Sequence, residues 1–136
     1  PGMDEEITPG QLQELKDKFV AGQFADRTPM FVEQPFEVSI DGIVIRGRMD
    51  AVFRDESGWH IVDWKTGQLP SRADMRYLMM QLAVYRIAWA QLQGIDPDEI
   101  HASFYYVRYD KLSSADNLPS EREIAETLRL AAQPIE

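Results

Sequence analysis

The 136-residue chain contains no cysteine. This absence excludes disulfides, thiolate zinc sites, iron–sulfur clusters held by cysteine, and cysteine nucleophiles from the sequence. It fits a reducing compartment, and we therefore expect a cytoplasmic protein. The sequence also lacks any run of roughly 18 apolar residues, so we expect neither a membrane-spanning helix nor a membrane partner.

Basic residues are scarce relative to acidic ones. There are 14 Lys and Arg against 23 Asp and Glu, which gives a net charge of −9. A domain that binds nucleic acid by its own affinity usually has a basic surface, so this balance argues against such a partner. Two circumstances would reverse that conclusion. Clustered carboxylates can bind divalent cations, which invert the local charge, and a domain tethered to a DNA-bound motor needs little affinity of its own.

What the sequence does contain is enough for one ordered domain. Its hydrophobic fraction of 44% is that of a globular protein and not of a disordered chain. We therefore expect residues 1–136 to form a single domain. Because the chain begins with Pro1 in place of methionine, we also expect it to be a piece of a longer protein.

Hydrophobic periodicity predicts both helices and strands. Leu12, Leu15 and Phe19 repeat at helical spacing, whereas the residues from Phe36 to Ile40 alternate as in a strand. A helix between the third and fourth strands indicates a crossover, which makes that pair parallel. The order αβββαβα therefore predicts an α/β fold with a mixed central sheet flanked by helices. The helices are expected at residues 9–25, 72–93 and 120–132, and the strands at 30–40, 43–54, 59–65 and 101–109.

Two carboxylates and a lysine are expected to gather on this sheet. The period of a strand puts Asp63 and Lys65 on one face, and antiparallel pairing through a turn at 55–58 puts Asp50 opposite Asp63. Carboxylate oxygens are preferred ligands of Mg²⁺, and a bound cation beside a lysine suits phosphodiester hydrolysis. The spacing by itself is equally compatible with a surface ion pair between Asp63 and Lys65 beside an unrelated acid.

Three short motifs favour the first interpretation. They stand in the order Gly47-Arg48-Met49-Asp50, Asp63-Trp64-Lys65-Thr66-Gly67 and Gln81-Leu82-Ala83-Val84-Tyr85. Together they resemble the signature of RecB-like nucleases of the PD-(D/E)xK group, over about residues 31–90. The resemblance implies a restriction-endonuclease-like fold, whose αβββαβ core agrees with the order of elements predicted above.

The resemblance also implies roles for individual residues. Asp50 and Asp63 would bind Mg²⁺ or Mn²⁺, together with the backbone carbonyl of Trp64 and, as a further candidate, Glu33. A solvated strand glutamate is the alternative for Glu33. Lys65 would be the catalytic lysine. The resemblance thus predicts a metal centre at the ends of two neighbouring strands.

Other candidates surround this centre. Gln81 and Tyr85 lie four residues apart on one helical face, where they would contact the site or the DNA strand, with plain packing as the alternative. Arg48 shares the strand parity of Asp50 and is therefore expected on the same face, where it would contact phosphate or pair with the acids. Arg72, at the start of the long helix, is a candidate contact to phosphate, with a solvated face as the alternative. The tyrosines of the fourth strand are expected to pack within the sheet, with base stacking as the alternative. They are Tyr105, Tyr106 and Tyr109.

One element of the resemblance is missing. Many RecB-like nucleases place a metal-binding histidine on a helix before the first strand, and the helix at 9–25 has none. His60 has the strand parity opposite to Asp63, and His101 lies on a later strand, so both are expected to be packing or edge histidines. Either this subgroup lacks the histidine or it precedes the present chain.

The resemblance implies a metal-dependent deoxyribonuclease. Such domains occur at the C-terminus of bacterial DNA-repair and recombination helicases of the RecBCD, AddAB, AdnAB and UvrD-like kinds, so we expect DNA and a helicase motor domain as partners. The chain has no phosphate-binding P-loop, which places any motor outside it. The alternatives are a catalytically inactive module for DNA guidance or subunit docking, and a stand-alone endonuclease or junction resolvase.

Overall fold

The computed structural model of the chain describes residues 8–115 and 117–131. In this part of the chain the predicted order αβββαβα is confirmed, and a short additional strand, β5, precedes the last helix. The helices are α1 (Pro9–Ala21), α2 (Arg72–Gln93) and α3 (Glu121–Ala131), with short 3₁₀ helices η1 (Pro97–Glu99) and η2 (Val107–Tyr109). The strands are β1 (Phe31–Ile40), β2 (Ile43–Asp55), β3 (Gly58–Lys65), β4 (Ile100–Tyr106) and β5 (Lys111–Ser113).

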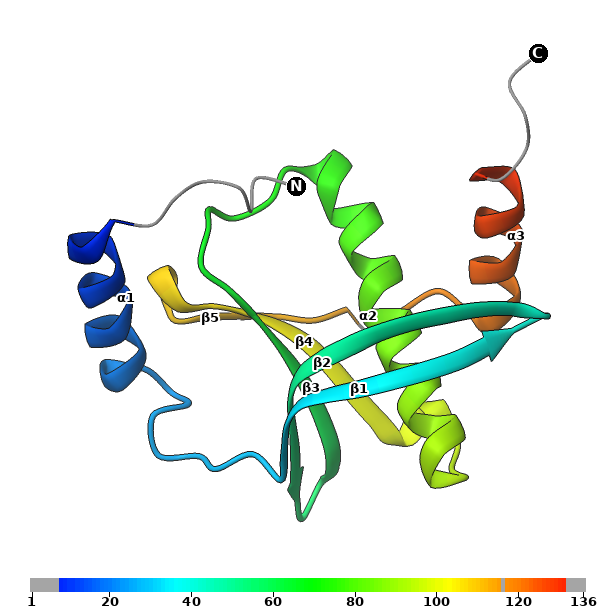
Figure 1. Ribbon diagram of the computed structural model, residues 1–136, viewed down its shortest axis with the longest axis horizontal. Coiled ribbons are helices and arrows are strands. Elements are labelled where there is room, and N and C mark those ends of the chain that lie inside the picture. The colour runs from blue at the N-terminus through cyan, green and yellow to red at the C-terminus, as the bar shows by residue number, and fades with distance from the viewer. Residues whose placement is uncertain (1–7, 116, 132–136) are drawn as a thin grey trace.

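The strands form one mixed sheet in the order β1-β2-β3-β4-β5. β3 and β4 are parallel, while the other neighbouring pairs are antiparallel. The parallel pair is the one that α2 connects, so the predicted crossover is confirmed. In Figure 1 the strands pass between α1 and α2, which therefore cover opposite faces of the sheet. The predicted mixed sheet flanked by helices is thus the observed architecture.

Each face of the sheet carries its own core. The α2-side core contains the buried side chains between the sheet, α2 and α3, and the α1-side core contains those between the sheet and α1. The α2-side core includes Phe36, Met49, Val52, Ile61, Leu82, Tyr85, Trp89, Phe104, Tyr106 and Ile124. The α1-side core includes Leu15, Phe24, Ala51, Phe53, Val62, Tyr105 and Val107.

The turn end of the β1–β2 hairpin extends beyond the other strands of the sheet, toward the C-terminal helix. Its turn is formed by Asp41 and Gly42, both with positive φ, of 51° and 80°. This is the primed turn geometry that the Asp-Gly pair predicts. Figure 1 shows the hairpin crossing α2 and reaching α3. Gln91 of α2 donates a hydrogen bond of 3.2 Å to the carbonyl of Ser39, and Arg129 of α3 pairs with Asp41.

The helix ends follow from local sequence signals. Thr8 caps α1 and forms a capping box with Gln11, and Ser71 caps α2 by accepting from the Asp74 backbone. Both caps satisfy amide groups that have no partner inside the helix. Gly94 ends α2 with a left-handed conformation, φ 68°. Among the described helices, none combines the length and the apolar character needed to cross a bilayer.

The alternation of buried positions changes within β2. Met49 and Val52 both belong to the α2-side core, although three residues separate them. The change lies opposite Glu33 of β1, which has a φ of 47°. Glu33 forms no pair in the β1–β2 ladder, although its neighbours do, in the pairs Val32–Ala51 and Gln34–Met49. A positive φ in a strand rotates the following backbone and so alters which face its side chains meet. As a result, the even-numbered residues of β2 from Asp50 onward face α2.

Two predicted boundaries were wrong. The first helix ends at Ala21, not at residue 25, because the chain turns at Gly22 to pass close to β4. A Cβ at Gly22 would lie 2.3 Å from the Tyr105 hydroxyl, so only glycine permits this approach. The fourth strand ends at Tyr106, not at residue 109, because Val107–Tyr109 form η2 and Asp110 reverses the chain into β5 with a φ of 48°.

Candidate active site

Asp50 and Asp63 lie opposite each other on β2 and β3. The ladder between these strands ends with the pair Ala51–Val62, so the next position brings Asp50 level with Asp63. There the backbone pairing is replaced by a side-chain contact, in which the Trp64 N–H donates a 2.9 Å hydrogen bond to Asp50 Oδ2. The register predicted from the turn at 55–58 is therefore confirmed.

Asp63 is a buried carboxylate with one unsatisfied oxygen. Only 5% of the residue is exposed. The Lys65 ammonium forms an ion pair of 3.0 Å with Asp63 Oδ2, and apart from this ion pair Oδ2 has no hydrogen-bond partner among the described residues. Lys65 Nζ also lies 4.9 Å from the centre of the Phe104 ring. A buried carboxylate oxygen in this state is poised to accept a further ligand.

The other oxygen of Asp63 is held from α2. Tyr85 donates a 3.3 Å hydrogen bond to Asp63 Oδ1, and Gln81 Nε2 donates a 2.7 Å hydrogen bond to the Tyr85 hydroxyl. Because Gln81 and Tyr85 are four residues apart, one helical face supplies the whole chain of contacts. The structure thus places both residues at Asp63, as supports of the carboxylate.

The glycine of the first motif supports the same tyrosine indirectly. Gly47 pairs with Phe36 across the hairpin, and a Cβ on Gly47 would lie 2.7 Å from the tip of the Phe36 ring. The Phe36 ring meets Tyr85 edge-on, with centroids 5.7 Å apart and an interplanar angle of 85°. Glycine at position 47 therefore lets Phe36 lie across β2 and pack against the residue that holds Asp63.

The electrostatics of the site favour a bound cation. Burial, and then the neighbouring Asp63 carboxylate, raises the pKa of Asp50 to about 6, against the lowering effects of the Trp64 N–H and Lys65. Two carboxylates this close destabilise each other's charged form. A divalent cation between them would remove that repulsion. The donor set, two carboxylates with one unsatisfied oxygen, fits Mg²⁺ or Mn²⁺.

The protein supplies few side-chain ligands for such an ion. Within residues 8–115 and 117–131 no three His, Cys, Asp or Glu side chains are grouped closely enough to hold a metal. A site of two carboxylates leaves the remaining positions to backbone carbonyls, water or substrate, which is how Mg²⁺ is usually bound. Trp64 anchors this part of β3, because its ring packs against Phe19 of α1 on the opposite face, with centroids 5.6 Å apart.

The structure does not bring all of the predicted residues to the acids. Glu33 falls opposite Asp50 in the strand register, but it is exposed and belongs to no group of metal ligands. Arg48 was expected on the face of Asp50, and this was wrong, because the change of alternation after Met49 leaves it on the other, exposed side. Arg72 is exposed at the first position of α2. Contact of either arginine with DNA remains a prediction.

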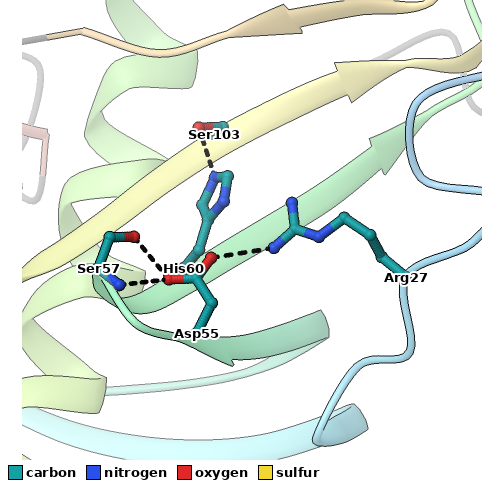
Figure 2. A network of polar contacts seen from close by, with 5 residues as sticks. All are labelled: Arg27, Asp55, Ser57, His60 and Ser103. Atoms are coloured by element: carbon teal, nitrogen blue, oxygen red, sulfur yellow. Dashed lines mark hydrogen bonds and ion pairs between the residues drawn. The ribbon is translucent and has the colours of Figure 1, made fainter.

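His60 lies on the face away from the acids, as its strand parity predicts. Figure 2 shows its ring directed at Ser103, with a contact of 2.9 Å between His60 Nε2 and Ser103 Oγ. Nearby, Asp55 accepts from Ser57 and pairs with Arg27 at 3.4 Å. Burial, and then the positive Arg27, lowers the pKa of His60 to about 4. His60 is therefore a neutral packing histidine of the α1 side.

The residues of β4 that lie beside Asp63 and Lys65 were not predicted from the sequence. Phe104 lies beside Asp63 in the parallel register of β3 and β4, and Tyr106 lies beside Lys65. The predicted crossover implied a parallel pair but not its register, since no short turn links the two strands. The period of a strand puts Phe104 and Tyr106 on one face of β4. This shared face could be read from the sequence, but the partners of the two residues on β3 could not.

Three comparisons relate the chain to known proteins. The sequence model of the PD-(D/E)XK nuclease superfamily matches residues 4–135. Gene 69 protein of Mycobacterium phage D29 is 37% identical over 71 residues, which are 52% of this chain and 24% of that protein. The crystal structure of SSO0001 superposes with a TM-score of 0.48 and 20% identity, covering 93% of this chain and 62% of that one. The chain thus spans only part of the length of both.

Proposed function

The chain belongs to the PD-(D/E)XK nuclease superfamily, and we propose that it is a RecB-like domain that hydrolyses DNA phosphodiester bonds with Mg²⁺ or Mn²⁺. The observation that carries the proposal is the state of Asp63. Its carboxylate is buried, faces a second carboxylate, and keeps one oxygen without a hydrogen bond beside a lysine ammonium. A purely structural ion pair would not need the second acid, whose pKa is raised by burial and then by Asp63.

The residues of the site would divide the work as follows. Asp50 and Asp63 would hold the cation, with the Trp64 carbonyl as a further ligand. The bound cation would polarise the phosphate and lower the pKa of a coordinated water. Lys65 would stabilise the negative charge that develops on the phosphate oxygens, and its ammonium, 3.0 Å from Asp63 Oδ2, lies beside the oxygen that would bind the cation.

The supporting residues would keep Asp63 in one orientation. Tyr85 holds Oδ1 and leaves Oδ2 for the cation, and Gln81 holds the hydroxyl of Tyr85. Such second contacts keep a ligand in the geometry that the metal requires. The part of the third motif that carries Gln81 and Tyr85 would therefore serve the metal centre and not the DNA strand.

We also propose that the domain works beside a helicase motor in DNA repair or recombination. The motif resemblance to RecB-like nucleases supports this context. The net charge of −9 supports it as well, because a domain of this charge attracts DNA weakly by itself. Attachment to a DNA-bound motor would supply the local DNA concentration that the surface does not.

The second candidate function is a catalytically inactive module of the same fold. It is favoured by the small ligand set, since the described residues gather two acids and no histidine at the site. The two candidates differ in one assay. End-labelled single- and double-stranded DNA is incubated with the chain and Mg²⁺, Mn²⁺ or EDTA, with Lys65→Ala as the control. Metal-dependent cleavage that the substitution removes supports the nuclease, and equal cleavage by both proteins contradicts it.

A further inference from the structure

A hydroxyl group of β4 lies buried on the site's side of the sheet without a partner. Tyr106 is 2% exposed, and its hydroxyl has no hydrogen-bond partner among the described residues. Burying a hydroxyl without a hydrogen bond destabilises a folded protein. Such a group in a native fold therefore needs an explanation, and an unseen water or ligand is the usual one.

The position of this hydroxyl connects it to the acids. Tyr106 pairs with Lys65, and Phe104 pairs with Asp63, in the parallel register of β3 and β4. Paired residues of parallel strands share a face, and Tyr106 and Phe104 both belong to the α2-side core. Tyr106 therefore lies next to Lys65 and diagonal to Asp63. Burial, and then the negative charge of Asp63, raises the pKa of Tyr106, so its hydroxyl keeps its proton.

Tyr105 shows what a structural tyrosine looks like in the same strand. It faces the α1-side core, and its hydroxyl donates a 2.5 Å hydrogen bond to Asp110. A tyrosine that serves the fold thus has its hydroxyl satisfied by the protein. Phenylalanine would fill the position of Tyr106 equally well by shape, as Phe104 does two residues earlier on the same face.

Two unsatisfied groups consequently lie on one side of the sheet around Lys65. Tyr106 offers a hydroxyl that can donate, and Asp63 Oδ2 offers an oxygen that can accept. A water molecule between them would satisfy both, because a buried water typically makes two to four hydrogen bonds to polar groups. Asp63 Oδ2 has two lone pairs, so it can accept from this water and also bind the cation. The Lys65 ammonium lies 3.0 Å from Asp63 Oδ2, and Lys65 is the partner of Tyr106 in the strand register.

We propose that the Tyr106 hydroxyl is a further catalytic group of this site, which binds the water used in hydrolysis and orients it together with Asp63 Oδ2. The inference rests on the proposed nuclease function. Tyr106 makes and breaks no covalent bond in this role. It donates a hydrogen bond to the water and thereby fixes the direction of attack.

The test compares Tyr106→Phe with Tyr105→Phe in the whole chain. For Tyr106→Phe we expect DNA cleavage in Mn²⁺ to slow at least about tenfold in kcat. The KM, the Mn²⁺ affinity and the melting temperature should not fall, since the substitution removes only an unsatisfied hydroxyl. For Tyr105→Phe we expect the reverse: a lower melting temperature, because the bond to Asp110 is lost, with unchanged kcat.

Each other outcome overturns the inference. Equal kcat in the wild-type chain and Tyr106→Phe would show that the hydroxyl has no part in the reaction, while the nuclease function would stand. A loss of Mn²⁺ affinity in Tyr106→Phe would show that the residue acts on the metal ligands and not on water. Absence of cleavage by the wild-type chain with every metal contradicts the proposed function, and the inference then fails with it.

Discussion

The backbone N–H of Trp64 donates a 2.9 Å hydrogen bond to the side chain of Asp50, at the point where the β2–β3 ladder ends. This contact places the Asp50 carboxylate between two strands and next to Asp63. The side chain takes the position that a backbone carbonyl would otherwise fill, so the sheet itself holds the acid in place. The following predictions test what that arrangement does.

Replacing Asp50 by asparagine should stabilise the metal-free protein. Burial and Asp63 raise the Asp50 pKa from 3.8 to about 6, so the charged form is disfavoured in the fold. Asparagine removes the charge and can still accept the hydrogen bond from Trp64. Because the group is partly exposed, solvent screening limits the gain to roughly 1 kcal/mol, or about 4 °C in melting temperature at pH 7.5.

The pH dependence of that gain has a definite sign. The folded state holds the Asp50 proton more tightly than the unfolded state, so this residue contributes stability below pH 3.8 that is lost as pH rises through about 6. The difference between Asp50→Asn and the wild-type chain should therefore be largest above pH 6 and vanish toward pH 4. Comparing the two proteins cancels the effect of His60, which titrates in both. A constant difference across this range would contradict the account.

Replacing Tyr85 by phenylalanine should weaken the site and the fold together. The substitution leaves Asp63 Oδ1 and the Gln81 amide without their partner, and an unsatisfied buried group costs about 1–3 kcal/mol. We expect lower stability in urea unfolding and weaker Mn²⁺ binding. In a double-mutant cycle with Gln81→Ala, the two effects should not add, because the residues form one chain of contacts. Additive effects would show that Gln81 acts independently of Tyr85.

Replacing Gly47 by alanine should disturb Asp63 from a distance. The new Cβ would lie 2.7 Å from the Phe36 ring, which must then move against Tyr85. Overpacking of this kind costs about 1–3 kcal/mol. We expect a lower melting temperature and weaker Mn²⁺ binding.

Gly10→Ala is the matched control for Gly47→Ala. Apart from its chain neighbours and the backbone of its own helix, nothing lies within 4 Å of a Cβ at Gly10, which is an exposed position of α1. Alanine there should leave the stability unchanged or raise it by less than about 0.5 kcal/mol, because Gly10 lies in the first turn and not in the interior of α1. Unchanged Mn²⁺ binding in Gly47→Ala would contradict the account, because it would show that Gly47 does not support the metal centre through Phe36 and Tyr85.

The strand order and pairing were predictable from the sequence because short turns set them. Asp41-Gly42 and the turn at 55–58 leave each hairpin one register, and these registers bring Asp50 level with Asp63. The crossover followed from the helix between β3 and β4 in the same way. Connections of this kind are local, and local sequence describes them well.

The face of Arg48 was not predictable, for the opposite reason. Strict alternation groups Arg48 with Asp50, but the positive φ of Glu33 on the partner strand accompanies a change of face after Met49. Non-glycine residues adopt such a conformation rarely, and glutamate gives no signal of it. The exposed Arg48 therefore lies away from the acids although its neighbour Met49 is fully buried.

The unsatisfied hydroxyl of Tyr106 was also beyond the sequence. Alternation predicts that Tyr105 and Tyr106 pack on opposite faces, which the structure shows. Whether a hydroxyl finds a partner depends on residues distant in the chain, such as Asp110 for Tyr105. Only the packed structure shows that Tyr106 lacks one.

Calorimetric titration with Mn²⁺ tests the central claim most directly. The wild-type chain, Asp63→Ala and Lys65→Ala are compared at pH 7.5, where Asp50 is ionised, with circular dichroism to show that each is folded. We predict saturable binding by the wild-type chain, no binding by Asp63→Ala, and undiminished affinity in Lys65→Ala, because that substitution removes only a positive neighbour of the ligand oxygen. Equal affinity in the wild-type chain and Asp63→Ala would contradict the assignment of the metal centre.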